Sequence, residues 1–173
     1  VILMDLDMPG LDGFAAARAI RADPQAGGAC ILALSAHAED GYRARAAEAG
    51  LDGFVVKPAT ASQLAAAIAG ALLDAAVTGP LREALGDADW EALVASFAAS
   101  AHDALDEAAE TGHARALHAL KGVAWNVGAR RLGDRAAALE RLPAGAMRAG
   151  LPALRRLLEA SLAALRARGQ GRP

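Results

Sequence analysis

The chain has 173 residues and a formal net charge of −2 at pH 7 without a long block of one sign, so electrostatics give no reason to expect nucleic acid or an anionic membrane as a partner. Its single cysteine, Cys30, excludes an internal disulfide framework and fits a reducing compartment, for which we expect a cytoplasmic location. Hydrophobic residues, mostly Ala and Leu, make up 54% of the chain, and this composition favours helices. The longest apolar run, at 64–73, has about half of the roughly 20 residues that a membrane-spanning helix needs, so we expect no direct membrane contact.

Short apolar runs alternate with helical stretches over the first 73 residues. The runs at 1–4, 31–34 and 54–56 are typical of buried strands in a parallel sheet. The Ala-rich stretches between and after them predict helices over residues 14–21, 38–49 and 61–73. This repeated strand-helix order predicts an open α/β sheet with crossover helices. Because the first run begins at Val1 with no preceding turn or cap, we interpret the chain as cut inside a domain.

Each predicted strand ends in a polar group. Asp5 and Asp7 follow the first strand, Ser35 ends the second and Lys57 ends the third. Ligands of α/β proteins bind at the carboxyl ends of such strands, so a carboxylate, a hydroxyl and an ammonium should lie together there. Such a set could hold a phosphoryl group, with the carboxylate as nucleophile and the other groups binding its oxygens. Taken alone, the Asp-x-Asp pair could equally be a turn or capping feature, and we interpret Asp12 as the cap of the following helix.

The strand ends carry the motifs LMDLDMPGLDG at 3–13, ALSAHA at 33–38 and DGFVVKP at 52–58, which together resemble the receiver domain of response regulators. The resemblance implies a flavodoxin-like fold in which Asp5 is the phosphorylated aspartate. It further implies that Lys57 and Ser35 bind the phosphoryl group, that Phe54 is the aromatic that moves with the switch, and that the backbone carbonyl of Asp7 joins Asp5 in binding Mg²⁺. It also implies a cis bond between Lys57 and Pro58, where proline makes the cis form accessible.

The sequence departs from the receiver family ahead of Asp5. The earlier strands are missing, and with them the paired acids with which the family holds Mg²⁺. We therefore expect residues 1–73 to form a truncated receiver, half of a flavodoxin-like fold with three parallel strands, an open sheet edge and an incomplete metal site. In this chain Asp5 should not take up phosphate efficiently.

The sequence changes character from residue 74 onward. Residues 74–80, with Gly79-Pro80 as the strongest turn signal, predict a linker. Beyond them we find no strand pattern, and apolar residues recur at spacings of three and four, as on one face of a helix. The clearest such positions are Trp90, Leu93, Phe97 and Ala101, followed by the leucines of 151–165. Residues 81–168 therefore predict a helical bundle, and residues 169–173 a disordered tail.

His118 lies in a helical stretch that starts near His113. On a helical wheel, the apolar side consists of Leu117, Leu120, Ala124 and Val127, and the opposite side of His118, Lys121, Gly122 and Trp125. His118 should therefore face solvent, with Lys121 one turn away and able to contact any anion that His118 carries. Near Gly128 the apolar residues no longer fall on the same side of the wheel, which predicts a bend there.

Two neighbours of His118 on the same face are unusual. Gly122 costs roughly 1 kcal/mol in a helix interior, and clearance for a docking partner beside His118 is a reason for it. Trp125 either contacts that partner, since Trp is favoured at interface hot spots, or folds back over the bundle. The remaining histidines, for which we expect solvent-facing positions, are His37, His102 and His113.

The stretch ALHALKGVAWNVGARRLGDRAAAL at 116–139 resembles the histidine phosphotransfer (HPt) family, and the resemblance extends over 81–168. It implies a four-helix bundle in which His118 accepts and donates a phosphoryl group without kinase activity of its own. Imidazole suits this chemistry because it is nucleophilic near neutral pH and forms a phosphoramidate that passes its group onward. The partners implied are the receiver domains of response regulators and the kinase core of a parent protein.

The sequence therefore predicts a phosphorelay component of a two-component system that passes a phosphoryl group between Asp5 and His118. The order of the two modules resembles the C-terminal part of bacterial hybrid sensor histidine kinases, whose kinase core is not in this sequence. The alternatives are a standalone receiver–HPt adaptor, a structural interaction module that is not phosphorylated, and, more remotely, a metal-dependent hydrolase built on Asp5 and Asp7. An upstream reading frame with an ATP-binding kinase core would decide between the first two.

Overall fold

The computed structural model describes residues 1–8, 12–23, 26 and 28–167. The chain divides into two compact units, residues 1–71 and 72–173, which are described separately. The predicted disordered tail at 169–173 and the centre of the first motif, residues 9–11, lie outside the described residues.

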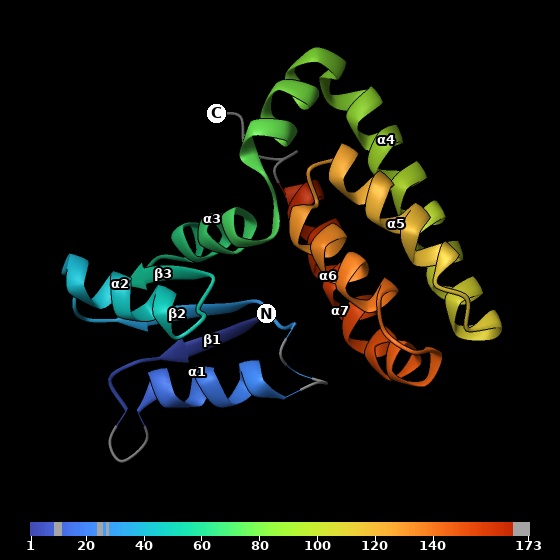
Figure 1. Ribbon diagram of the computed structural model, residues 1–173. Coiled ribbons are helices and arrows are strands. Elements are labelled where there is room, and N and C mark those ends of the chain that lie inside the picture. Colours follow the sequence, from blue (N-terminus) through green and yellow to red (C-terminus); the bar gives the residue numbers. More distant parts are fainter. Residues whose placement is uncertain (9–11, 24–25, 27, 168–173) are drawn as a thin grey trace. The chain divides into compact units, whose positions relative to one another are not determined.

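The first unit is a parallel sheet of three strands in the order β1-β2-β3 (Figure 1). Met4 of β1 pairs with Ala33 of β2, which in turn pairs with Phe54 of β3. The elements are β1 (Ile2–Asp5), α1 (Gly13–Ala22), β2 (Ile31–Ser35), α2 (Asp40–Glu48), β3 (Gly53–Val56) and α3 (Ala61–Leu72). The predicted alternation of parallel strands and helices is confirmed.

The central strand β2 is covered on both faces, as its continuous apolar run requires. Ile31 and Ala33 are fully buried in a core that α1 supplies with Phe14 and Ala17. On the other face α3 comes close, because a Cβ built on Gly53 would lie 4.0 Å from Ala71 Cβ. As predicted, the Asp12 side chain caps α1, accepting a hydrogen bond from the Phe14 backbone N–H at 3.0 Å.

The second unit is a bundle of four helices (Figure 1). The helices are α4 (Ala75–Thr111), α5 (Arg115–Asn126), α6 (Arg130–Glu140) and α7 (Ala144–Ala167). Contacts of α4 with α5 and α7, and of α6 with α5 and α7, close the bundle around an apolar core. Trp90 is buried to 1% exposure in this core and its indole N–H donates to the Leu165 carbonyl oxygen. The four-helix architecture predicted for this region is confirmed.

The linker predicted over 74–80 is wrong, because α4 begins at Ala75 and continues through Pro80. Asp74 caps this helix by accepting a hydrogen bond from the Ala76 N–H at 3.0 Å. An interior proline removes one backbone donor and crowds the carbonyl four residues before it, but α4 continues through Gly79-Pro80, so this pair makes no turn here. The regular helical backbone is broken instead at Gly86, which has φ 75° and ψ 175°.

The bend predicted near Gly128 is a full break between α5 and α6. Gly128 has φ +77°, a conformation that favours glycine, and its carbonyl oxygen accepts a hydrogen bond from the Asp74 N–H at 2.7 Å. A Cβ at Gly128 would lie 2.6 Å from the Thr78 methyl group. The turn after α5 is therefore packed tightly against the start of α4.

In the part of the chain that the structure describes, no single helix is long and apolar enough to cross a membrane. Among the described helices, the bent pair formed by α3 and α4 passes that test of length and composition together.

Candidate functional site

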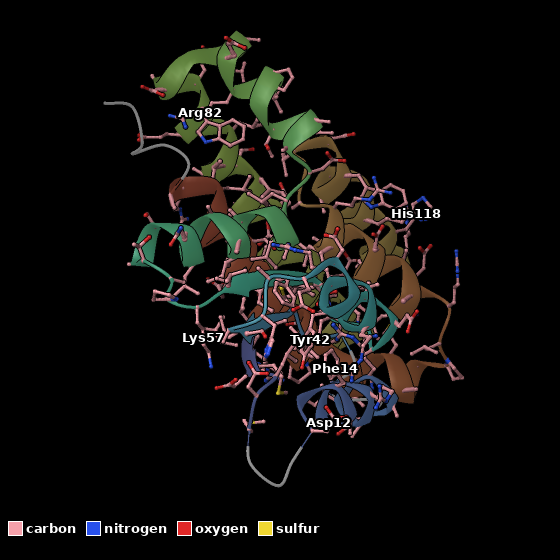
Figure 2. All side chains as sticks on the ribbon, turned by 90° about the vertical axis from the view of Figure 1, so that its left-hand side faces the viewer. Asp12, Phe14, Tyr42, Lys57, Arg82 and His118 are labelled. Carbon is pink, nitrogen blue, oxygen red and sulfur yellow. The ribbon has the colours of Figure 1, made fainter. Side chains whose placement is uncertain are left out.

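His118 lies on the outer face of α5, as the helical wheel predicts. Leu117, Leu120 and Ala124 are fully buried on the inner face of the helix, whereas the His118 side chain is 66% exposed. Figure 2 shows the histidine at the outside of the bundle. A docking partner can therefore reach its imidazole without any rearrangement of the core.

The His118 imidazole is held by a carboxylate from the neighbouring helix. Its Nδ1 lies 2.7 Å from Glu140 Oε1 at the C-terminal end of α6. Lys121 donates to the other oxygen, Oε2, at 3.0 Å, and its Nζ lies 3.1 Å from His118 Nδ1. Sequence reasoning predicted the proximity of His118 and Lys121 but missed Glu140. The only signal for it was an acid directly after Leu139, where the stretch 116–139 ends.

The protonation state of this group follows from the types of partner. The hydrogen bond from Lys121, and next the one from His118, lower the pKa of Glu140 below its ordinary value, so that Glu140 is a carboxylate at neutral pH. An ionised carboxylate can only accept hydrogen bonds. We therefore assign the imidazole proton to Nδ1, which leaves the lone pair on Nε2 facing outward.

The two unusual neighbours of His118 occupy different surroundings. Around Gly122 an added Cβ would meet no atom within 4 Å outside the local helix backbone, so the space expected beside His118 is open. Trp125 is 44% exposed, yet its Nε1 donates to Asp134 Oδ1 at 3.1 Å. A Cβ on Gly133 would lie 2.4 Å from the indole, so the ring rests on α6 while keeping one part open to solvent.

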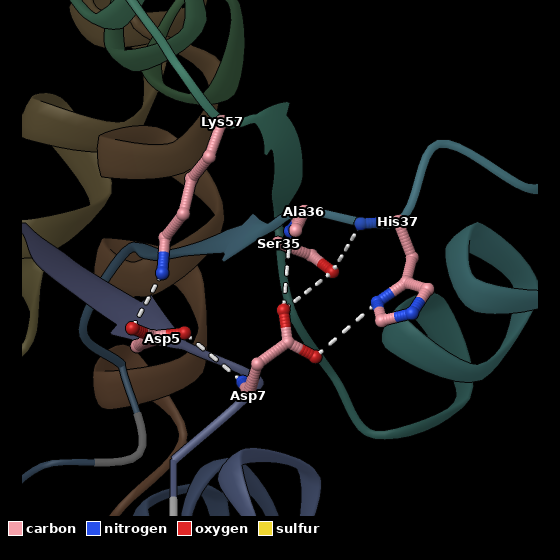
Figure 3. A network of polar contacts seen from close by, with 6 residues as sticks. All are labelled: Asp5, Asp7, Ser35, Ala36, His37 and Lys57. Atoms are coloured by element: carbon pink, nitrogen blue, oxygen red, sulfur yellow. Dashed lines mark hydrogen bonds and ion pairs between the residues drawn. The ribbon is translucent and has the colours of Figure 1, made fainter.

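In the first unit, the strand ends bring Asp5 and Lys57 together, as predicted (Figure 3). Lys57 Nζ lies 2.5 Å from Asp5 Oδ2, and the Asp7 N–H donates to Asp5 Oδ1 at 3.0 Å. The Lys57 hydrogen bond is the main cause of a lowered pKa of the Asp5 carboxyl. A carboxylate at this place can act as a nucleophile beside a cation. The bond between Lys57 and Pro58 is cis, as expected.

The Asp7 side chain has a role that the sequence did not indicate. Its Oδ2 accepts hydrogen bonds from Ser35 Oγ and the Ala36 N–H, each at 3.1 Å (Figure 3). The Ala36 N–H is the largest cause of a lowered pKa of Asp7. Its Oδ1 lies 3.4 Å from Nδ1 of His37. His37 is 48% exposed but is more than a solvent-facing loop residue, since its ring also stacks on Tyr42 with centroids 4.6 Å apart.

Phe54, the expected switch aromatic, lies half-buried on β3. Its ring is covered by Arg43 of α2, whose guanidinium carbon is 4.9 Å from the ring centroid. This contact joins the aromatic ring to the helix that follows Ser35. The structure gives Phe54 in one conformation, so its role as a switch residue stays a prediction.

The acids of the first unit do not by themselves fit a Mg²⁺ site. Six oxygen ligands are usual for Mg²⁺, but within the described ranges no three His, Cys, Asp or Glu side chains gather in a metal-binding group. Asp5 is paired with Lys57, and Asp7 is bonded to Ser35 and Ala36. That Asp5 takes up little phosphate in this chain stays a prediction, to be checked by labelling with acetyl phosphate and Mg²⁺.

Comparison with known families agrees with this division of the chain. The family model described as the Hpt domain matches residues 80–168, the bundle that presents His118. The chain belongs to the Hpt domain family. The response regulator receiver domain matches residues 1–69, so the Hpt bundle follows receiver-type sequence, as the motifs indicated. These are modules of two-component phosphorelay.

Curated relatives match a 63-residue part of this Hpt-family chain. Chemotaxis protein CheY of Pseudomonas aeruginosa is 40% identical over 63 residues, which are 36% of this chain and 51% of that protein. Chemotaxis protein CheY-3 of Vibrio cholerae is 36% identical over 63 residues, 36% of this chain and 48% of that protein. The chain thus spans about half the length of the curated relatives that it matches.

Proposed function

We propose that this chain carries a phosphoryl group on Nε2 of His118 and exchanges it with the aspartate of a receiver domain. The observation that supports this most is the exposed His118 imidazole, whose Nδ1 is held 2.7 Å from Glu140 on an Hpt-family bundle. An imidazole whose Nε2 faces solvent and whose Nδ1 is held by a carboxylate needs no further catalytic group from this chain. Positioning and charge neutralisation account for most of the catalysis of phosphoryl transfer.

In the transfer step, the lone pair of His118 Nε2 attacks the phosphorus of an aspartyl phosphate. The N–P bond forms as the bond from phosphorus to the aspartate oxygen breaks, and the aspartate leaves as a carboxylate. No proton has to move, because the imidazole keeps its Nδ1 proton and becomes a phosphorylated imidazolium. Glu140 stabilises that positive charge through the 2.7 Å contact, and the reverse reaction returns a neutral imidazole.

Lys121 supplies the mobile positive charge of the site. Its ammonium is bound to Glu140 Oε2 at 3.0 Å and lies 3.1 Å from the imidazole. Lysine has a flexible stem, so the ammonium can turn to the phosphoryl oxygens once they arrive. We propose that Lys121 first holds Glu140 in place and then neutralises the transferred group.

We further propose that Asp5 is the receiver aspartate upstream of His118, with Lys57 and Ser35 binding its phosphoryl oxygens. The parent would be a bacterial hybrid sensor histidine kinase acting in the cytoplasm, and its partners would be its own kinase core and the receiver of an output regulator. The support is the receiver-type match at 1–69 ahead of the Hpt bundle. A receiver–Hpt adaptor without a kinase core is the alternative, and the coding sequence upstream decides between them.

The test is transfer of ³²P from isolated receiver domains, loaded with labelled acetyl phosphate, to the full chain of residues 1–173. Wild type should gain label that is stable in alkali and lost in acid, as expected of phosphohistidine, whereas His118→Gln should gain none. His102→Gln is the matched control, because His102 is a partly exposed helical histidine beside a carboxylate, Glu159, at 2.8 Å, and this variant should label like wild type. Equal labelling of wild type and His118→Gln would place the site elsewhere. No labelling of wild type by any donor in the panel would favour a structural module.

A further inference from the structure

The indole of Trp125 is both exposed and fixed. Its Nε1 donates to Asp134 Oδ1 at 3.1 Å, its ring lies against Gly133, and Lys121 Nζ is 5.9 Å from its centroid. With 44% of its surface open, it is one of the few large hydrophobic side chains that the described part of the bundle exposes. An aromatic side chain that is already ordered loses little entropy when a partner covers it.

Trp125 also lies in the path of any protein that reaches His118. Both residues are on α5, seven positions apart, which is about 10 Å along a helix and within about 20° of the same direction. A standard interface covers about 800 Å² of each partner, equivalent to a disc of about 16 Å radius. A receiver domain that brings its aspartate to Nε2 of His118 therefore has to cover Trp125. The open space around Gly122, between the two residues, lets that surface come close.

We propose that Trp125 is a specificity-determining residue of phosphotransfer: it is the apolar anchor on which the partner receiver domain docks beside its phosphoaspartate. This inference rests on the proposed role of His118 and adds which surface selects the partner. The occupant is a receiver that presents an apolar side chain next to its phosphoaspartate. Asp134 and Arg130, linked at 3.9 Å, form the polar border of the contact.

The structure offers variants that separate docking from folding. Trp125→Ala removes the anchor, and Trp125→Phe keeps an apolar ring over Gly133 but loses the hydrogen bond to Asp134. Gly133→Ala leaves the indole intact but displaces it, because the new Cβ would lie 2.4 Å from the ring. Thermal unfolding of each variant shows whether the bundle remains folded.

The experiment measures the single-turnover rate of ³²P transfer to the full chain at increasing concentrations of a tryptophan-free receiver loaded with acetyl phosphate. For Trp125→Ala we expect the half-saturating receiver concentration to rise roughly thirtyfold, as for a hot-spot residue, with the maximal rate within twofold of wild type. Gly133→Ala should also raise the half-saturating concentration, and Trp125→Phe should leave this concentration within threefold of the wild-type value. Acrylamide quenching gives a second readout, since Trp90 is 1% exposed and receiver binding should protect only Trp125.

Other outcomes would overturn the proposal. A half-saturating concentration within twofold of wild type for Trp125→Ala would show that the partner does not dock on the indole. A fall in the maximal rate alone would show that Trp125 acts through the position of His118. If wild type takes up no label, the role of His118 itself fails, and this inference fails with it; label on wild type with no effect of Trp125→Ala contradicts the docking role alone.

Discussion

Glu140 Oε1 on α6 lies 2.7 Å from His118 Nδ1 on α5. This contact joins two neighbouring helices, although the two residues are 22 positions apart in the sequence. The carboxylate fixes both the ring orientation and the position of the imidazole proton. In the proposed mechanism, the nucleophilic nitrogen is thus selected by a residue that does not contact the phosphoryl group.

Replacing Glu140 by Gln should slow phosphotransfer without unfolding the bundle. The amide has the same shape but no charge, so it stabilises the phosphorylated imidazolium less and permits the wrong tautomer. We expect the maximal transfer rate from a labelled receiver to fall roughly tenfold, which corresponds to about 1.4 kcal/mol, while the half-saturating concentration changes little. Glu159→Gln, which changes the carboxylate paired with His102, is the matched control and should transfer like wild type. Equal rates for Glu140→Gln and this control would contradict the role of Glu140.

The same residue makes bundle stability depend on pH. Hydrogen bonds from Lys121 and then His118 lower the pKa of Glu140 from its ordinary value of 4.5. A carboxyl whose folded-state pKa is lowered contributes stability that is present above its unfolded pKa and is lost as pH falls through the folded-state pKa. The Tm difference between wild type and Glu140→Gln should therefore shrink as the pH falls below about 4.

Thermal melts of both proteins across this pH range check the expectation, because the other carboxyl groups titrate in both and cancel in the difference. A difference that stays constant down to pH 3 would show that Glu140 carries no such linkage.

Much of this fold could be predicted because periodicity and strand-end chemistry are local in sequence. The helical wheel predicted which residues of α5 face the core and which face solvent, and in the structure Leu117 is buried and His118 is exposed. The approach of Lys57 to Asp5 followed from the rule that parallel strands end at one edge.

Contacts between helices could not be predicted in the same way. The pairing of Glu140 with His118 depends on how α6 is rotated against α5, which no local pattern specifies. The bond from Ser35 to the Asp7 side chain likewise depends on the loop after β1. The break at Gly86 was missed because Gly79-Pro80 gives a stronger turn signal, although a capped helix accommodates that pair. Local signals thus located the candidate reacting residues but not the residues that hold them.

Gly122 provides a test of the clearance expected beside His118. Because an added Cβ meets no neighbour within 4 Å, Gly122→Ala should stabilise the helix by about 1 kcal/mol and raise Tm. Gly122→Gln should keep that stability but slow transfer from a receiver at least tenfold, since a long side chain fills the space that the partner needs. Ala119→Gln, an exposed position on the same helix, is the control for added bulk alone. Transfer by Gly122→Gln at the wild-type rate would show that no partner surface enters this space.

Gly128 and Gly86 both have a positive φ, of 77° and 75°, but their surroundings differ. At Gly86 an added Cβ meets nothing within 4 Å, whereas at Gly128 it would lie 2.6 Å from the Thr78 methyl and 3.1 Å from the Asp74 carbonyl oxygen. Gly86→Ala should cost only backbone strain, about 1–3 kcal/mol, because φ 75° with ψ 175° is a conformation that only glycine readily adopts. Gly128→Ala adds a clash with packed backbone and should cost about 3 kcal/mol or more. Urea unfolding followed by tryptophan fluorescence measures both, because the two tryptophans of the chain, Trp90 and Trp125, lie in the bundle. A loss of only about 1–2 kcal/mol for Gly128→Ala, the cost of the left-handed conformation alone, would show that the start of α4 does not pack on the α5–α6 turn in solution.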